Sequence, residues 1–178
     1  MAGSRGDERA WIRGAQSGSV SDLEALFRHH WPRAYRAAYL VVHDAAAAED
    51  IAQEAFLAAV RGLDRFDRRR PFGPWLHRIV VNRAIDWSRA RALRRESGDA
   101  WLAQLAAPDT REGSQAEALA TALAELSPEH RAVIVMRHLL EYTPGEIAET
   151  LGLPRGTVNS RLRRGLDELA GRLREEVR

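Results

Sequence analysis

Cysteine and lysine are both absent from this chain of 178 residues. Without cysteine the protein can form no disulfide, no thiolate zinc site and no cysteine nucleophile, which fits a reducing cytoplasm. No apolar run approaches the roughly 20 residues that a membrane-spanning helix needs, and the N-terminal residues lack the pattern of a signal peptide. The six histidines are scattered and suggest no metal-ligand spacing and no catalytic triad. We therefore expect a cytoplasmic protein that is not an enzyme, holds no cofactor or metal, and does not insert into a membrane.

Because lysine is absent, all 27 basic residues are arginine, and they are unevenly distributed. Residues 64–95 contain ten arginines and three acids, and residues 155–165 contain four arginines and no acid. Residues 44–54 show the opposite bias, with four acids and no base. The formal net charge of +2 hides this pattern. Two basic clusters far apart in the sequence indicate two places where a polyanion is bound.

Apolar residues at helical spacing dominate the chain, and no segment alternates in the manner of a β-strand. We expect an all-α protein with two small helical domains joined by a flexible linker. The expected boundaries are a flexible N-terminal arm at 1–20, a first domain at 21–95, the linker at 96–115 and a second domain at 116–178. Glycine, serine or proline content and weak periodicity define the arm and the linker.

Local signals place the helices of the first domain. Ser21 opens a capping box that starts a helix, and Pro32 is expected to break or restart that helix. Asp44 is expected to cap a helix that ends near Gly62. A short arginine-rich loop then leads into a helix from about residue 74 to 95.

The second domain contains YTPGEIAETLGLPRGTVNSRLRRGL at residues 142–166, which predicts two short helices joined by a tight turn. Thr143 and Glu146 form a capping box on the first helix, Gly152 supplies its left-handed exit, and the second helix opens near Pro154. The inner face of the second helix repeats Val158, Leu162, Leu166 and Leu169. This pattern indicates a helix-turn-helix whose outer face suits phosphates and base edges in a DNA major groove. A helical hairpin with a merely solvated basic face is the alternative.

Three segments in order carry a resemblance to a known family: AAAAEDIAQEAFLAAV, FGPWLHRIVVNRAIDW and LSPEHRAVIVMRHLLEYTPGEIAETLGLPRGTVNSRLRRGLDEL. Together they closely resemble bacterial RNA polymerase sigma factors of the extracytoplasmic-function (ECF) group, which have only conserved regions 2 and 4. The resemblance implies a protein that joins the β and β′ subunits of core RNA polymerase and directs the enzyme to particular promoters. Region 2 would bind the minus-ten element as a single strand and help to open it, and region 4 would bind the minus-thirty-five element as a duplex.

The acidic segment is where the resemblance places the docking surface for core polymerase. Helical spacing puts Glu49, Asp50, Gln53 and Glu54 on one surface. An acidic surface would favour rapid association with basic residues of the polymerase. An acidic face that is only solvated is the alternative.

The arginine loop and the helix after it are where the resemblance places the contacts to the minus-ten element. A basic groove with aromatic platforms suits a single DNA strand with unstacked bases. The residues expected to contact that strand are Arg68, Arg69, Arg70, Phe72, Trp75, His77, Arg78, Asn82, Arg83 and Arg89. By resemblance the loop at 66–73 shapes a pocket for a flipped base, and Asn82 contacts nontemplate bases. Trp75 and Trp87 each fit a place in the core better than a place at the DNA.

The helix-turn-helix supplies the residues expected to contact the minus-thirty-five duplex. These are Thr143, Arg155, Thr157, Asn159, Ser160, Arg161, Arg163 and Arg164. Asn159 stands where lysine is common in the family, and it can influence promoter choice because asparagine binds adenine through two hydrogen bonds. Gly165 stands where alanine is common, at a cost of about 1 kcal/mol in helix stability.

Two other functions fit parts of the sequence. A sigma-like decoy would bind an anti-sigma protein without touching DNA, but such a decoy should have lost the basic surfaces that this chain keeps. A simple helix-turn-helix repressor would need a ligand pocket and usually a dimerisation helix, and the sequence indicates neither. The resemblance also implies control by an anti-sigma protein, which commonly covers both domains of an ECF sigma factor.

Overall fold

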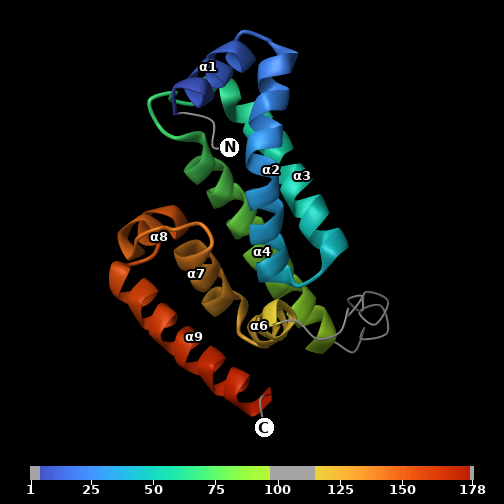
Figure 1. Ribbon diagram of the computed structural model, residues 1–178, viewed down its shortest axis with the longest axis vertical. Helices are drawn as coiled ribbons and strands as arrows, with labels where there is room; N and C mark the ends of the chain where they lie inside the picture. Colours follow the sequence, from blue (N-terminus) through green and yellow to red (C-terminus); the bar gives the residue numbers. More distant parts are fainter. Residues whose placement is uncertain (1–4, 97–114, 177–178) are drawn as a thin grey trace.

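The computed structural model describes residues 5–96 and 115–176, and its regular elements in these two ranges are all helices (Figure 1). The α-helices of the first lobe are α1 (Arg5–Gln16), α2 (Val20–Val42), α3 (Ala45–Gly62) and α4 (Phe72–Glu96), with a 3₁₀ turn, η1, at Leu63–Arg65. Those of the second lobe are α6 (Gln115–Ala124), α7 (Pro128–His138), α8 (Pro144–Leu151) and α9 (Arg155–Glu176). The expected all-α class is confirmed. Apart from its two end residues, the linker expected at 96–115 lies outside the described residues.

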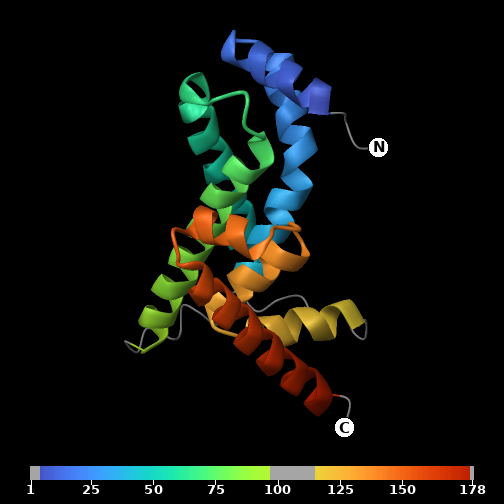
Figure 2. The ribbon, with the colours of Figure 1, turned by 90° about the vertical axis from the view of Figure 1, so that its left-hand side faces the viewer.

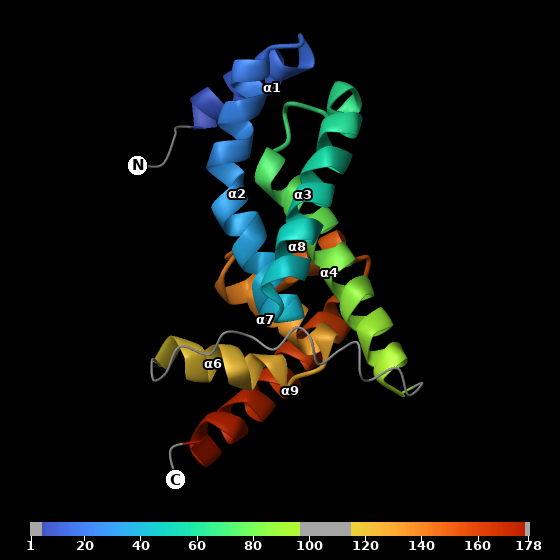
Figure 3. The same cartoon turned by 90° about the vertical axis from the view of Figure 1, so that its right-hand side faces the viewer.

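Helices α2, α3 and α4 form a three-helix bundle that is the body of the first lobe (Figure 3). Ala34, Ala37 and Ala38 of α2 are completely buried. Their small side chains let the backbones of α3 and α4 approach closely. Asp44 accepts a hydrogen bond from the Ala47 amide and caps α3, as the sequence predicts.

The long helix α2 differs from its prediction in two ways. Its N-cap is Ser19, which accepts from the amide of Asp22, so the helix begins before Ser21. Pro32 lies within the helix and does not interrupt it. Pro32 is exposed, so the carbonyl that it leaves without an amide partner is near water, while buried residues on the opposite face hold the helix in the bundle.

The sequence predicts a flexible arm at residues 1–20, but within it Arg5–Gln16 form helix α1. It lies across the N-terminal end of α2, with Ile12 completely buried and Trp11 partly buried against the core (Figure 2). The segment is short and mostly polar, so its local propensity does not predict a helix. Packing against α2 stabilises it, which is how most short helices form in proteins.

The helix-turn-helix formed by α8 and α9 agrees closely with its local signals. The Thr143 amide donates to Glu146 Oε2 at 2.8 Å, the Glu146 amide donates to Thr143 Oγ1, and Gly152 ends α8 with φ of 65°. Val158 of α9 is completely buried, but Leu166 is 39% exposed and does not complete the expected apolar face. Helix α9 begins at Arg155, next to the predicted position.

Gly165 lies where α9 packs closely against α7. A Cβ atom at this position would lie 3.0 Å from Ile134 Cδ1 and 3.1 Å from His130 Cβ. Real Cβ atoms rarely have such close neighbours, so the glycine lets the two helices cross closely. Glycine at this position lowers the stability of the helix, as expected from the sequence, but it also allows α9 to pack closely on α7.

The two lobes pack against each other rather than standing apart. Helices α6 and α7 contact α2, and α7 and α8 contact α4 (Figure 3). Polar contacts cross the same boundary: Arg33 bonds Glu141 at 3.2 Å, and Arg89 bonds Glu129 at 2.8 Å. Buried apolar residues of both lobes form one continuous cluster.

Candidate polymerase and nucleic-acid interfaces

The acidic surface of α3 lies open to solvent. Glu49, Asp50, Gln53 and Glu54 are all exposed, whereas Ile51 and other residues of the opposite face are buried. Gln53 Nε2 donates to Glu49 Oε1 at 3.2 Å, which ties two of the four side chains together. Helical spacing thus brings these residues to one surface, where a basic partner can reach them.

An apolar groove beside this acidic surface has no counterpart in the sequence predictions. It runs between α2 and α3, and Val20, Phe27, Leu57 and Val60 in it are 78%, 39%, 54% and 41% exposed. Gln53 lines the groove as well, so the acidic and apolar surfaces are continuous. Large apolar residues gathered on a surface commonly mark a protein-binding site. Leu57 and Val60, placed near the solvated acidic face, are the signal that could have revealed it.

The tip of the arginine loop, residues 66–71, is shaped by Asp67. Its side chain accepts from the Arg69 amide at 3.0 Å, and its carbonyl accepts from the Arg70 amide at 2.8 Å. Arg68, Arg69 and Arg70 are all exposed, and Arg69 Nε lies 3.5 Å from the Asp67 carboxylate. The loop therefore presents three guanidinium groups to solvent in a small space, which suits a phosphate backbone.

Aromatic side chains form the base of this loop. Phe66 stacks on Trp75 with ring centroids 4.6 Å apart and an interplanar angle of 28°. Phe72 is only 3% exposed and packs edge-on against both rings, so it belongs to the core. This corrects the expectation that Phe72 contacts DNA, because its ring is already covered by the aromatic cluster.

His77, also expected at the minus-ten strand, lies in the contact between the lobes, and its role at DNA stays a prediction for the form in which the lobes are apart. It is 5% exposed, and its Nδ1 atom is 2.9 Å from the hydroxyl of Tyr142. Burial, with smaller effects of the charges on His30 and Arg33, lowers the pKa of His77 to about 3. Burial also raises the pKa of Tyr142, so a protonated hydroxyl and a neutral imidazole share this hydrogen bond. In this arrangement His77 cannot reach DNA.

The other residues expected at the minus-ten strand lie along α4 and the loop. Arg78, Asn82 and Arg83 line a shallow hollow with Trp75, which is partly buried. Arg83 forms an ion pair with Glu54, so it links this surface to the acidic one. Arg89 is turned toward the second lobe, where it bonds Glu129.

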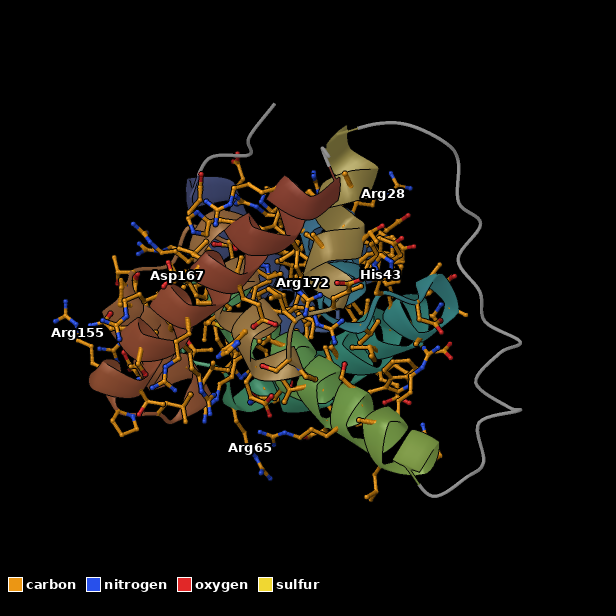
Figure 4. All side chains as sticks on the ribbon, turned by 90° about the horizontal axis from the view of Figure 1, so that it is seen from below. Arg28, His43, Arg65, Arg155, Asp167 and Arg172 are labelled. Atoms are coloured by element: carbon orange, nitrogen blue, oxygen red, sulfur yellow. The ribbon has the colours of Figure 1, made fainter. Side chains whose placement is uncertain are left out.

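A groove separates the arginine loop from α8. Arg70, Trp75 and Arg78 line one side of it, and Glu146 and Glu149 line the other. Acidic residues of the second lobe thus face the basic loop of the first. Arg65, at the edge of this groove, projects away from the body of the protein (Figure 4).

The outer face of α9 carries the residues expected at the duplex. Arg155, Asn159, Arg163 and Arg164 are exposed, whereas Thr157, Ser160 and Arg161 are partly buried. Within the described ranges no acid pairs with Arg155, Arg163 or Arg164, and Arg155 points outward from the first turn of the helix (Figure 4). The Thr143 hydroxyl, in contrast, already donates to Glu146 Oε2 at 2.7 Å.

Two kinds of feature are absent from residues 5–96 and 115–176. No cluster of three or more histidine, aspartate or glutamate side chains in these ranges could hold a metal ion. None of the helices described there is both long and apolar enough to cross a membrane.

Comparison with known proteins gives the same two units in the same order. Residues 26–95 match the family model of Sigma-70 region 2, and residues 116–169 match that of Sigma-70, region 4. The chain is 32% identical to the ECF RNA polymerase sigma factor SigW of Bacillus subtilis, over 92% of this chain and 94% of that protein. It is 34% identical to SigL of Mycobacterium tuberculosis, over 86% of this chain and 89% of that protein.

Solved structures show the same fold. CnrH in complex with the cytosolic domain of CnrY superposes with a TM-score of 0.70 at 29% identity, covering 95% of this chain and 98% of that one. The sigma factor RpoE of Bartonella quintana, in complex with the anti-sigma factor NepR, gives a TM-score of 0.70 at 23% identity over 87% and 98%. Sequence and fold together place this protein in the family of ECF RNA polymerase sigma factors.

Proposed function

We propose that this protein is a promoter-specificity subunit of bacterial RNA polymerase, acting in the cytoplasm and without catalytic residues of its own. It binds the core enzyme and directs initiation at promoters with particular minus-ten and minus-thirty-five elements. The observation that carries this proposal is the combination of one acidic face and two exposed basic surfaces on a single chain of this family.

The core enzyme is proposed to bind the acidic surface of α3 together with the apolar groove beside it. Glu49, Asp50, Gln53 and Glu54 would pair with basic residues of the β and β′ subunits. The groove would take apolar side chains of the same subunits, and Gln53 joins the two surfaces. Charged residues then favour rapid encounter, and apolar burial favours a long-lived complex.

The minus-ten strand is proposed to follow the arginine loop and α4. Its phosphates would contact Arg68, Arg69, Arg70, Arg78 and Arg83, and its bases would contact Trp75 and Asn82. The duplex at minus thirty-five is proposed to lie on α9. Its contacts would be Arg155, Thr157, Asn159, Ser160, Arg161, Arg163 and Arg164, while Thr143 would mainly fix α8.

Binding both elements at once would require the lobes to separate. Elements centred about 25 base pairs apart lie roughly 85 Å apart along a duplex with about 3.4 Å per base pair. Here the arginine loop and α8 line a single groove. We propose that the core enzyme holds the lobes apart, so that the contacts between them are lost in the holoenzyme.

Control by an anti-sigma protein is proposed as well, as is common among ECF sigma factors. CnrH, which this chain resembles over almost its whole length, was solved as a complex with the cytosolic domain of another protein. The exposed apolar groove and the acidic face offer such a partner the surfaces that the polymerase would need.

Transcription in vitro with purified core polymerase over a library of genomic fragments tests the proposal. Mapped start sites should share two elements at fixed spacing, and Asp50→Lys should lower capture of core polymerase by about tenfold. Asp167→Lys is the matched control, because Asp167 is an exposed acid on α9, in the other lobe (Figure 4). Start sites without a shared element, or equal capture by both variants, would contradict the proposal.

A further inference from the structure

We infer that helix α1 positions the arginine loop, with Gln16 and Glu8 as the positioning residues. The inference rests on the proposed function, because it assumes that the loop binds the minus-ten strand. It assigns a role to a segment for which the sequence predicts only a flexible arm. The role requires no contact between α1 and DNA.

Gln16 holds the segment at which the loop begins. Its side-chain amide donates two hydrogen bonds, to the carbonyl of Leu63 at 2.9 Å and to the carbonyl of Phe66 at 3.0 Å. These carbonyls belong to the first residue of η1 and to the residue that follows it, so one side chain at the end of α1 fixes the turn that connects α3 to the loop. The partners are 47 and 50 residues away in the chain, and the contact therefore exists only in the folded state.

Glu8 acts at the other end of the loop through His30. The Glu8 carboxylate lies 2.9 Å from His30 Nε2, and the two side chains are only 17% and 9% exposed. The His30 ring packs against Phe72 with centroids 5.1 Å apart. A Cβ atom on Gly73 would lie 3.4 Å from His30 Cε1. The His30 ring, held by Glu8, thus packs against the first turn of α4, where the loop ends.

The electrostatics of this pair agree with a fixed contact. The pKa of Glu8 is lowered, chiefly by its hydrogen bond with His30, despite the opposing effect of burial. An ionised carboxylate makes a stronger hydrogen bond to a nitrogen donor than a neutral acid does. Glu8 therefore ties α1 to α2 directly beneath Phe72.

Fixing both ends leaves only the five residues 67–71 between Phe66 and Phe72, and Asp67 folds this short tip. Three adjacent guanidinium groups repel one another, and a free loop would spread them over many conformations. A loop that is already ordered loses less entropy when it binds a strand, so it binds more tightly and discriminates better between sequences. Helix α1 would in this way set the selectivity of a surface that it does not touch.

Gln16→Ala in the full-length protein tests the inference in two steps. Hydrogen exchange, which needs neither polymerase nor DNA, should show faster exchange of residues 66–71 and unchanged exchange in α9. The holoenzyme should then bind a single-stranded minus-ten oligonucleotide from a mapped promoter about tenfold more weakly. It should also discriminate less against a scrambled oligonucleotide, while its affinity for the minus-thirty-five duplex stays the same.

Four further variants separate positioning from a general loss of stability. Gln16→Glu keeps the shape but sets a carboxylate against two carbonyls, so its effect should equal or exceed that of Gln16→Ala. Glu8→Gln keeps a polar partner for His30 and should be milder than Glu8→Ala. Ser17→Ala is the matched control, because Ser17 directly follows Gln16 and its hydroxyl donates back to the Arg13 carbonyl of α1 at 3.1 Å, away from the loop.

The outcomes distinguish the inference from the function on which it rests. Unchanged loop exchange in Gln16→Ala, or equal weakening for matched and scrambled strands, would overturn the positioning role. A wild-type holoenzyme that binds no minus-ten strand would instead overturn the proposed function, and the exchange measurement would still decide whether α1 orders the loop.

Discussion

The helix-turn-helix and the arginine loop present similar chemistry on very different supports. In the second lobe the arginines project from one regular helix, whose start is fixed by neighbouring residues such as Thr143 and Gly152. In the first lobe they project from a loop whose ends are held by α1 and α2, more than twenty residues away. A basic surface can therefore be built from local signals alone, or it can depend on the assembled tertiary structure.

The two surfaces also differ in the partners of their arginines. Arg163 and Arg164 pair with no acid in the described part of the chain. Arg69, Arg83 and Arg89 pair with Asp67, Glu54 and Glu129 respectively. A phosphate can approach the α9 arginines without displacing anything, whereas DNA at the first lobe must compete with carboxylates that are already bound. We expect the helix-turn-helix to bind DNA independently and the loop to need the polymerase to open its surroundings.

The largest expected effect comes from replacing Arg163 and Arg164 together with alanine. The affinity for the minus-thirty-five duplex should fall about 100-fold, and the slope of log affinity against log salt should decrease by about two. Titration by fluorescence anisotropy at several salt concentrations measures both quantities. Arg174→Ala, an exposed arginine near the end of α9, is the control. An unchanged salt slope would mean that the α9 arginines do not face DNA, and the contrast between the two surfaces would collapse.

An intermediate effect is expected from acidification, which should open the contact between the lobes. The pKa of His77 is about 3 here and 6.5 in its ordinary state, so between these values only the opened or unfolded form takes up a proton. The closed form should therefore lose about 2 kcal/mol between pH 7 and pH 5. Its full stability is present above pH 6.5 and is lost as the pH falls.

Small-angle scattering or an interlobe fluorescence distance, followed from pH 7 to pH 5, measures this opening. His77→Gln should remove most of the response, because that side chain does not titrate. His138→Gln, which changes an exposed histidine, should leave the response intact. If the wild type and His77→Gln open in parallel, another group controls the contact.

The smallest expected effect is on the free energy of unfolding, and it comes from glycine-to-alanine changes in α9. Gly165→Ala should destabilise the protein by about 1 kcal/mol, because the clash with Ile134 and His130 outweighs the gain in helix propensity. Gly171→Ala, on the same helix, should instead stabilise it by up to about 1 kcal/mol, since nothing lies within 4 Å of a Cβ there. Urea unfolding of both variants checks the sign. Stabilisation of both would show that α7 yields to a larger side chain at Gly165.

Much of the second lobe could be predicted because its information is local. The capping box at Thr143, the left-handed Gly152 and the cap at Ser127 are each fixed by neighbours within four residues. Pro32 and Leu166 show where such signals fail. Proline is tolerated on the exposed side of a helix held by its bundle, and an apolar repeat is buried only where another helix covers it.

The candidate surfaces also differ in how far the sequence predicts them. Helical spacing alone brings Glu49, Asp50, Gln53 and Glu54 together, and the sequence predicted that surface. Phe72 and His77 were expected at DNA because they lie among basic residues in sequence, but burial is decided by what packs above them. Leu57 and Val60 hint at an exposed apolar surface, but only the tertiary structure places Val20 and Phe27 of α2 beside them to form the groove.

The sequence by itself determined the helical class, the order of the two regions, the helix-turn-helix and the clustering of charge. These properties depend on spacing, caps and composition, which act over a few residues. Only the tertiary structure decided that Gln16 of α1 bonds the turn before the arginine loop, that His77 bonds Tyr142 between the lobes, and that Arg83 pairs with Glu54. Each of these contacts joins residues 29 to 65 positions apart, and no local rule relates them.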